Sequence, residues 1–305
     1  MRFKNFYFFS FMLLGACQGS SPRNNPEKRI FQFEKIKGIK YQEVRRAFDN
    51  DIAFNDFGFE QEPEWAVQFL SDTLVKAYSP SLDSMITFPL IYSHGAVYNF
   101  ARNWFRVKKM SKDSLVLQRL EVNGKVIAHD IRSNVYMTFY SEDYLKKIHQ
   151  TVAELRKPRP KDSAFVRKHI NLANAHPLDS AYFFAARNPV KITSESKIVK
   201  VEKISNVNEL DNHTAAYDYL YPEYRITIHH AYKDFGYTVA VVADVSGILK
   251  FYRFQTVIEE PESQQKVVQG ILDVYVKNLC RVIPGQTLGM PHASVITLDL
   301  IGKKD

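Results

Sequence analysis

The sequence predicts an α+β fold made of two strand-rich parts. From Trp65 to Tyr140, aromatic and β-branched residues alternate with polar ones, as expected of an antiparallel sheet with one buried face. From Tyr224 onward, strand-like runs flank one amphipathic helix. With 305 residues, the chain is long enough for two domains. We therefore expect an N-terminal antiparallel β-meander, able to close like a barrel, over residues 30–155, and a C-terminal module of hairpin, helix and strand over 206–305.

The meander is predicted from short apolar runs that are separated by turn residues. Asn123-Gly124 is the strongest hairpin signal in the chain, and Lys112-Asp113 marks another turn. The expected strands are Ala66–Leu70, Leu74–Val75, Met85–Tyr92, Val97–Val107, Ser114–Val122, Lys125–Ala128 and Val135–Tyr140. Together they form a sheet whose neighbouring strands follow one another in the chain.

The rhythm of this segment resembles the small lipocalin-like domains of bacterial lipoproteins. Asp-Thr-Leu-Val at residues 72–75 recurs as Asp-Ser-Leu-Val-Leu at 113–117. The resemblance implies a barrel in which Trp65 and Trp104 line a cavity for a hydrophobic ligand. A filled aromatic core is the alternative interpretation of the same rings.

Helices are expected on either side of the meander. Ile36, Ile39, Val44 and Phe48 recur roughly on one side of a helix within Glu34–Phe48. A second helix is expected over Ser141–Leu155, with Ser141 as its N-cap. The basic segment 156–160 contains two prolines and ends that helix, so a connector is expected over 156–205. That connector would contain another helix after residue 163 and a strand at Lys197–Ile204.

The C-terminal part has the clearest order of elements. Glu259–Ser263 opens the helix, because proline is tolerated in the first turn and acidic side chains are favoured there. Its apolar face consists of Val267, Val268, Ile271, Leu272, Tyr275 and Leu279. The expected strands are Tyr224–Ala231, Tyr237–Asp244, Ile248–Val257 and Ala293–Ile301, with a turn at Val245–Gly247 and the helix ending at Ile283–Gln286.

This order resembles the TonB C-terminal domain. Asp244 to Gly247 matches the Asp-x-x-Gly turn of that family, Ile283-Pro284-Gly285 matches its Pro-Gly step after the helix, and Gly289-Met290-Pro291 matches its Gly-x-Pro step. The resemblance implies a module that contacts other envelope proteins, partly through an exposed strand edge. It does not imply energy transduction, because the chain has neither the membrane-spanning helix nor the long proline-rich spacer of TonB proteins.

The last strand is the candidate edge for such pairing. Its residues are Ser294, Val295, Ile296, Thr297 and Leu298. The competing interpretation places this strand inside the sheet.

The N-terminus predicts export and lipid attachment. Arg2 and Lys4 precede a short apolar run, which is too short to span a membrane, and Leu14-Gly15-Ala16-Cys17 resembles a bacterial lipobox. The resemblance implies a signal peptide at 1–16, cleavage between Ala16 and Cys17, and acyl chains on Cys17. Residues 17–29 would then be a flexible tether. We expect attachment to the bacterial outer membrane facing the periplasm.

Charge and cysteine content limit the kinds of partner and the cross-links that we expect. The full chain carries a formal charge of +8, and loss of Arg2 and Lys4 leaves 39 basic against 33 acidic residues. The basic clusters are Arg45-Arg46, Lys108-Lys109, Lys146-Lys147 and Arg156–Lys161. They predict a solvated surface or a mild attraction to anionic lipid headgroups. Binding to nucleic acid is disfavoured, because an exported protein would rarely meet it. Once Cys17 is acylated, Cys280 is the only thiol, so no intrachain disulfide is expected.

No motif in the sequence predicts catalysis or a cofactor. Adjacent His229 and His230 would point to opposite faces of a strand, so a shared metal is disfavoured. Asp49 to Asp56 lacks the oxygen spacing of a calcium loop. Cys280 is expected to be a small core residue. We therefore predict a non-enzymatic, lipid-anchored envelope protein that acts through protein contact; the alternative is a lipocalin-like carrier or sensor of a hydrophobic ligand.

Overall fold

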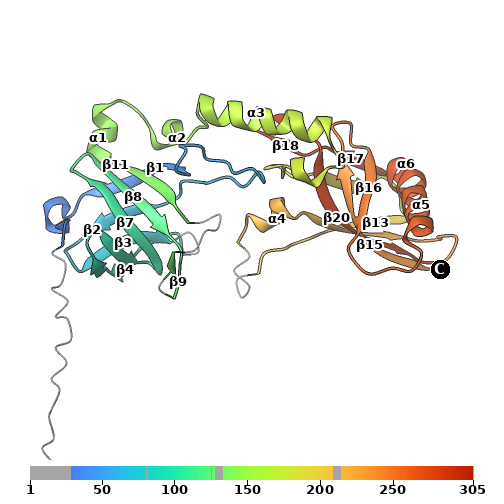
Figure 1. Cartoon of the computed structure of the whole chain (residues 1–305), viewed down its shortest axis with the longest axis horizontal. Helices are drawn as coiled ribbons and strands as arrows, with labels where there is room; N and C mark the ends of the chain where they lie inside the picture. The colour runs from blue at the N-terminus through green and yellow to red at the C-terminus, as the bar shows by residue number, and fades with distance from the viewer. Residues whose placement is uncertain (1–28, 80–81, 125, 128–132, 209–213, 305) are drawn as a thin grey trace, which may run out of the picture.

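Two lobes lie next to each other along the longest axis of the molecule (Figure 1). The N-terminal lobe is a strongly curled sheet, the C-terminal lobe is a second sheet with helices on one face, and α3 (Pro160–Ala175) runs across both. This mixed, strand-dominated architecture confirms the α+β prediction. The computed structural model describes residues 29–79, 82–124, 126–127, 133–208 and 214–304.

The N-terminal lobe is an antiparallel sheet that nearly closes. Its strand order is β4-β3-β2-β1-β11-β8-β7-β6-β5, so the two outermost strands are consecutive in the chain and only Leu90 separates them. The Leu90 amide donates to the Thr73 carbonyl at 2.8 Å, which fixes this corner. The strands are β1 (Lys40–Ala47), β2 (Ala66–Phe69), β3 (Leu74–Ser79), β4 (Ser84–Pro89), β5 (Ile91–His94), β6 (Val97–Phe100), β7 (Asn103–Met110), β8 (Ser114–Leu120) and β11 (Val135–Ser141).

The Asn123-Gly124 hairpin is present as expected. β9 (Val122–Asn123) pairs with β10 (Val126–Ile127), and Gly124 has a φ of +63°, a conformation that favours glycine.

Aromatic rings fill the interior of the curled sheet. The 3-10 turn at Phe33–Ile36 inserts Phe33 against Phe69, with ring centroids 4.3 Å apart, and Phe100 stacks on Phe105 at 4.4 Å. Trp65 meets Phe105 edge to face at 5.5 Å. These contacts are those of a filled aromatic core. Trp104 precedes the inward-facing Phe105 on β7 and therefore points to the opposite face of the sheet.

The helix expected over Glu34–Phe48 is wrong, because Lys40–Ala47 is strand β1. The strand lacks an alternating pattern because both of its faces are covered. Tyr41 and Glu43 lie on the inner face, where Glu43 is opposite Phe139 and accepts two bonds from Arg46, at 2.8 and 2.6 Å. After a bulge, Arg45 is buried on the outer face, where it binds Asp162 of α3 through two bonds of 2.7 and 2.9 Å.

The second expected helix is divided in two. α1 (Glu142–Lys147) begins at Ser141, whose hydroxyl accepts from the Tyr144 amide as predicted. His149 then adopts a φ of +53°, which ends the helical path. α2 (Val152–Leu155) starts afresh with a capping box between Thr151 and Glu154.

The segment 156–205, expected to be a connector, contains parts of the C-terminal lobe. α3 spans the two lobes, but β12 (Lys191–Ser194) and β13 (Val199–Ile204) pair with later strands. The C-terminal lobe therefore begins before residue 206.

The C-terminal sheet has the order β13-β14-β20-β15-β16. Its remaining strands are β14 (Glu223–Ile228), β15 (Phe235–Ala243), β16 (Leu249–Phe254) and β20 (Ser294–Gly302). β14 and β20 are parallel, and the other pairs are antiparallel. The turn that Asp244 stabilises separates β15 from β16, since the Asp244 carboxylate accepts from the Ser246 and Ile248 amides.

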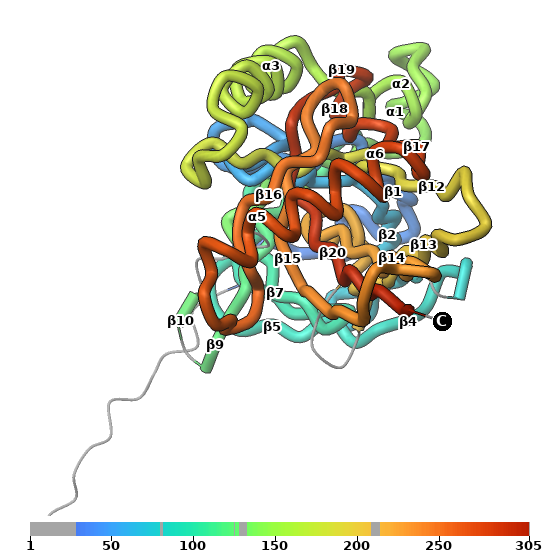
Figure 2. The backbone as a smooth tube through the Cα atoms, turned by 90° about the vertical axis from the view of Figure 1, so that its right-hand side faces the viewer, coloured from blue at the N-terminus to red at the C-terminus, as the bar shows by residue number. Residues whose placement is uncertain are grey.

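One face of this sheet is covered by the helix predicted from Glu259 onward. α5 (Pro261–Ile271) continues through a π-helical turn, Leu272–Val276, and α6 (Lys277–Leu279), and Figure 2 shows α5 in front of β15 and β20. The helix ends at Leu279, earlier than expected, because β17 (Cys280–Ile283) pairs with β12. Shorter elements are η3 (Ser180–Tyr182), α4 (Tyr217–Leu220), β18 (Gln286–Thr287) and β19 (Met290–Pro291).

Candidate functional site

The predicted edge strand is not at an edge. β20 is the central strand of the C-terminal sheet, bonded to β14 on one side and to β15 on the other. Thr297 is opposite Glu223 and Ala240, so the backbone on both sides of this strand is already paired. The prediction that Ser294, Val295, Ile296, Thr297 and Leu298 form an exposed edge is therefore wrong. The strand is buried because its apolar side chains complete the core beneath α5.

The true edges of the sheet, β13 and β16, are both protected against pairing. At β16, the Gln269 side chain of α5 accepts from the Phe251 amide at 2.9 Å and donates to the Leu249 carbonyl at 3.4 Å. At β13, the exposed side chains of Lys200 and Glu202 form an ion pair at 2.7 Å. Charged side chains and occupied backbone groups both discourage strand addition.

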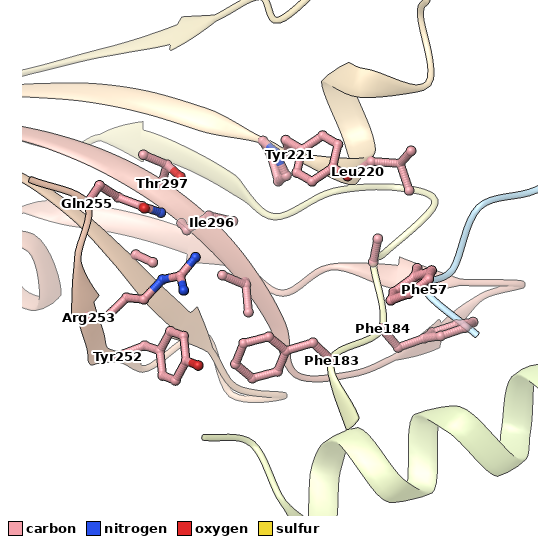
Figure 3. Close-up of a pocket in the computed structure, with 14 residues that line it drawn as sticks. Phe57, Phe183, Phe184, Leu220, Tyr221, Tyr252, Arg253, Gln255, Ile296 and Thr297 are labelled. Atoms are coloured by element: carbon pink, nitrogen blue, oxygen red, sulfur yellow. The ribbon is translucent and has the colours of Figure 1, made fainter. Parts of the chain in front are cut away.

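A cavity of about 250 Å³ lies on the other face of the same sheet, opposite α5 (Figure 3). We call it the junction groove, because both lobes contribute to it. Its lining is predominantly apolar and aromatic, with Arg253 and Gln255 as its charged and amide side chains. The lining residues are Phe57, Phe183, Phe184, Ala185, Leu220, Tyr221, Pro222, Ala240, Tyr252, Arg253, Gln255, Val295, Ile296 and Thr297.

Aromatic rings form the walls of the junction groove. Phe183 meets Tyr252 edge to face at 4.9 Å, and the Arg253 guanidinium lies 5.6 Å from the centre of the Tyr252 ring. Phe57 is 72% exposed and Tyr221 is 62% exposed, so both rings are accessible at the rim. Figure 3 shows the Arg253 guanidinium extending between Tyr252 and Ile296. The groove thus combines an apolar floor with one cationic group.

Phe57 reaches the groove on a loop of the N-terminal lobe. The Asn55 side chain accepts from the amides of Phe57 and Phe59 and holds the loop tip. The Phe57 carbonyl then accepts from the Ala185 amide at 2.9 Å. At Gly58, with a φ of +88°, a Cβ atom would lie 2.5 Å from the Ala185 carbonyl oxygen, so only glycine allows this crossing.

A cluster of charged residues next to the groove holds the wall that contains Leu220 and Tyr221. Arg187 binds Glu60 at 3.0 Å and also Glu62, and its guanidinium lies 4.6 Å from the centre of the Tyr219 ring. The Tyr219 hydroxyl accepts from the Glu60 amide at 3.0 Å. Burial raises the pKa of Tyr219 to about 12, so the phenol stays neutral. These contacts place Leu220 and Tyr221 directly beside the loop of the N-terminal lobe.

The other residues singled out by the sequence do not form a reactive site. His229 and His230 follow β14 in a bend instead of lying on the strand. Between Asp49 and Asp56, the Asn50 side chain accepts from the Ile52 amide, and Asp51 pairs with Arg159 at 3.2 Å. Burial raises the pKa of the Cys280 thiol to about 11, which keeps it protonated and unreactive.

Neither a metal site nor a membrane span is found in the described parts of the chain. No three His, Cys, Asp or Glu side chains there are grouped so that they could hold a metal ion. No helix among the same residues has the length and apolar character needed to cross a bilayer. Ala16 and Cys17 lie outside the described residues.

Three residues of the predicted edge strand do line the groove, but they do so from the face of the strand. Val295, Ile296 and Thr297 line its floor from β20, where the face of the strand and not its edge is presented. The aromatic wall was missed by sequence reasoning. Its only signal was the run Tyr182-Phe183-Phe184, which is ambiguous without knowledge of what packs against it.

No protein-family model matches the chain, and no curated protein matches it significantly.

Proposed function

We propose that this chain is a non-enzymatic, lipid-anchored protein of the bacterial envelope that binds a protein partner in the junction groove. The observation that carries the proposal is the composition of the groove. Tyr221, Tyr252 and Arg253 lie around an apolar floor, and tyrosine and arginine are among the residues that contribute most to protein–protein binding energy. Attachment through acylated Cys17 would keep this groove near the membrane.

The size of the groove favours a protein partner over a small molecule. Pockets that enclose small ligands usually measure about 300–1,000 Å³. At about 250 Å³ and with exposed rims, the junction groove has room for one or two large side chains of a docked protein. We expect the partner to insert an aromatic or aliphatic side chain and to place a carboxylate near Arg253.

The TonB C-terminal resemblance supports contact with another protein but points to a different surface. The hairpin β15–β16, the helix α5 and the closing strand β20 follow the expected order. Yet β20 is central, and Gln269 occupies the backbone of the outer strand β16. We therefore place the binding surface on the open face of the sheet and not on a strand edge.

The alternative, a carrier of a hydrophobic ligand, draws no support from the interior of the curled sheet. Phe33, Phe69 and Phe105 are nearly or completely inaccessible there and belong to one packed cluster. Native mass spectrometry of the purified protein distinguishes the two functions: a carrier would retain a bound ligand, whereas a protein that acts through protein contact would not.

Photo-crosslinking in cells tests the groove. With a benzophenone side chain in place of Tyr221, we expect one dominant product, and Arg253→Glu in the same chain should reduce it at least tenfold. Arg253 is exposed, so the substitution leaves the fold intact. The control position is Val274, which is 59% exposed on the helical side of the sheet. Equal products at Tyr221 and Val274, or no effect of Arg253→Glu, would contradict the proposal.

Membrane attachment has its own test. Palmitate supplied to the cells should label the wild-type protein and leave a Cys17→Ser variant unlabelled. If neither form is labelled and both stay in the membrane fraction, the anchoring part of the proposal is wrong.

A further inference from the structure

Lysines gather at one end of the curled sheet, which we call the basal end. The 3-10 turn at Phe33–Ile36 contributes to it, as do the start of β1, the turn between β7 and β8 and the end of β11. Two hydrogen bonds join these segments: the Tyr41 hydroxyl donates to the Ser111 carbonyl at 2.6 Å, and the Ser141 amide donates to the Asp113 carbonyl at 2.9 Å. The exposed lysines of the basal end are Lys35, Lys37, Lys40, Lys108, Lys109 and Lys112.

The N-terminal segment joins the folded body at this same end. The Arg29 guanidinium donates to the Asp72 carbonyl at 3.2 Å, the Phe33 amide donates to the Asp72 carboxylate at 2.6 Å, and the Ile30 amide donates to the Gly95 carbonyl at 3.4 Å. From Cys17 to Arg29 the chain advances by twelve residues, a reach of at most about 43 Å. A lipid on Cys17 would therefore hold the basal end close to the bilayer.

Exposed apolar side chains lie around the turn at Asp72 and Thr73, to which the N-terminal segment is bonded. Ile30 is 66% exposed, Leu74 is 42% exposed, and Ile91 is 52% exposed. Leu74 and Ile91 flank the corner where the Leu90 amide bonds to Thr73. A surface that carries both exposed apolar side chains and lysines is typical of proteins that rest at the membrane interface.

The charge balance at the basal end is positive. Arg29 and the six lysines face three carboxylates, Glu34, Asp72 and Asp113, which leaves a net charge of +4. Of these carboxylates, Glu34 pairs with Lys37 at 3.3 Å and Asp72 is bonded to the Phe33 amide. α1, which follows β11 here, adds two lysines and two carboxylates and leaves the balance unchanged.

We infer that the basal end docks on anionic lipid headgroups of the leaflet that holds the acyl chains of Cys17. This inference rests on the lipid anchor of the proposed function. A lipid and a basic surface acting together give stable membrane attachment. The C-terminal lobe lies at the other end of the long axis, so docking in this way holds it away from the bilayer (Figure 1).

Vesicle co-sedimentation tests the surface without the anchor. The protein is the processed chain from residue 17 onward, carrying Cys17→Ser so that no lipid is attached. At about 50 mM salt it should bind vesicles of phosphatidylethanolamine and phosphatidylglycerol and should not bind phosphatidylcholine vesicles. Binding should be lost at about 0.5 M salt, where the Debye length falls to a few ångströms.

Matched triple variants locate the binding surface. Lys40→Gln, Lys109→Gln and Lys112→Gln together should weaken the partition coefficient on the order of 100-fold, because each lysine near an anionic surface contributes about fivefold. Lys197→Gln, Lys203→Gln and Lys233→Gln remove the same charge from exposed positions of the C-terminal lobe and should change binding by less than about twofold. The urea midpoint of each variant confirms that it is folded.

Two outcomes would overturn the inference: no binding of the wild-type surface to anionic vesicles, or equal weakening by the two triple variants. Failure of the anchor is seen separately, as a wild-type protein that palmitate does not label. Vesicle binding is measured on the unacylated chain, so its outcome does not depend on whether Cys17 is acylated in cells.

Discussion

The two sheets of this protein bury their apolar residues in opposite ways. The N-terminal sheet curls until β4 and β5 meet at Leu90, and its inward rings pack on one another. The C-terminal sheet stays open. One of its faces is covered by α5, and the other carries the junction groove. Closure removes a binding surface from the first lobe, whereas an open sheet leaves one available in the second.

The closed sheet and the junction groove also differ in the burial of their aromatic residues. Phe69 is fully buried and stacked, while Phe57 is 72% exposed at the groove rim. The same residue type thus stabilises the fold in one place and presents a contact surface in the other. Burial, and not residue identity, decides the role.

The largest expected effect comes from a matched pair of ring deletions. Phe69→Ala should lower the free energy of unfolding by about 3–5 kcal/mol, because it opens a cavity in the packed interior. Phe57→Ala should change it by no more than about 0.5 kcal/mol, since an exposed side chain is lost. Urea denaturation measures both. Comparable losses would show that the groove wall is part of the core, and the contrast between the lobes would fail.

A buried ion pair gives the next effect. Asp162→Asn removes the buried carboxylate that binds Arg45 at 2.7 Å and leaves this guanidinium only the half-exposed Asp51 carboxylate at 3.8 Å, so it should cost about 3 kcal/mol. Asp51→Asn, which weakens the more exposed pairs with Arg159 and Arg45, should cost about 0–1 kcal/mol. The two urea midpoints are compared directly. A small loss for Asp162→Asn would mean that α3 is not held to the N-terminal lobe by this pair.

The smallest effect concerns acid stability and His292, which is fully buried in the C-terminal lobe. Its ring nitrogens bond to the Ala293 carbonyl and the Thr287 hydroxyl, both at 3.0 Å. Burial lowers its pKa below the ordinary 6.5. The unfolded chain therefore binds a proton more readily, and stability falls as the pH drops from 6.5 toward the lowered pKa.

His292→Gln should flatten this acid loss between pH 5 and 7, by at most about 1.4 kcal/mol per pH unit for one proton. His169, whose pKa burial also lowers, remains in both proteins and is removed by subtraction. Identical slopes for the wild type and the variant would assign the acid loss to other groups.

Local patterns predicted most strands of both sheets. Alternation located β2, β8 and β11, and Asn123-Gly124 located a hairpin, because these signals arise from residues close together in the chain. β1 was missed for a tertiary reason. Glu43 and Arg45 are buried through ion pairs on a strand that is covered on both faces, so a pattern of apolar residues alone cannot identify it.

The candidate site was anticipated in part and for the wrong reason. The sequence pointed to Val295, Ile296 and Thr297, but their place in the sheet depends on β14 pairing parallel to β20, and the sequence has no local signal for that pairing. Phe57 and Phe183 come from segments distant in the chain and meet only when α3 and the Gly58 crossing bring the lobes together.

The sequence by itself determined most of the elements, namely the alternating strands and one amphipathic helix with an acidic first turn, whereas the lipid anchor at the N-terminus stays a prediction. Each follows from the conformational preferences of neighbouring residues. Only the tertiary structure decided which sheet closes, which strand is central and which face remains open. Those outcomes depend on contacts between residues far apart in the chain, where burial of apolar surface and pairing of buried charges decide which arrangement is stable.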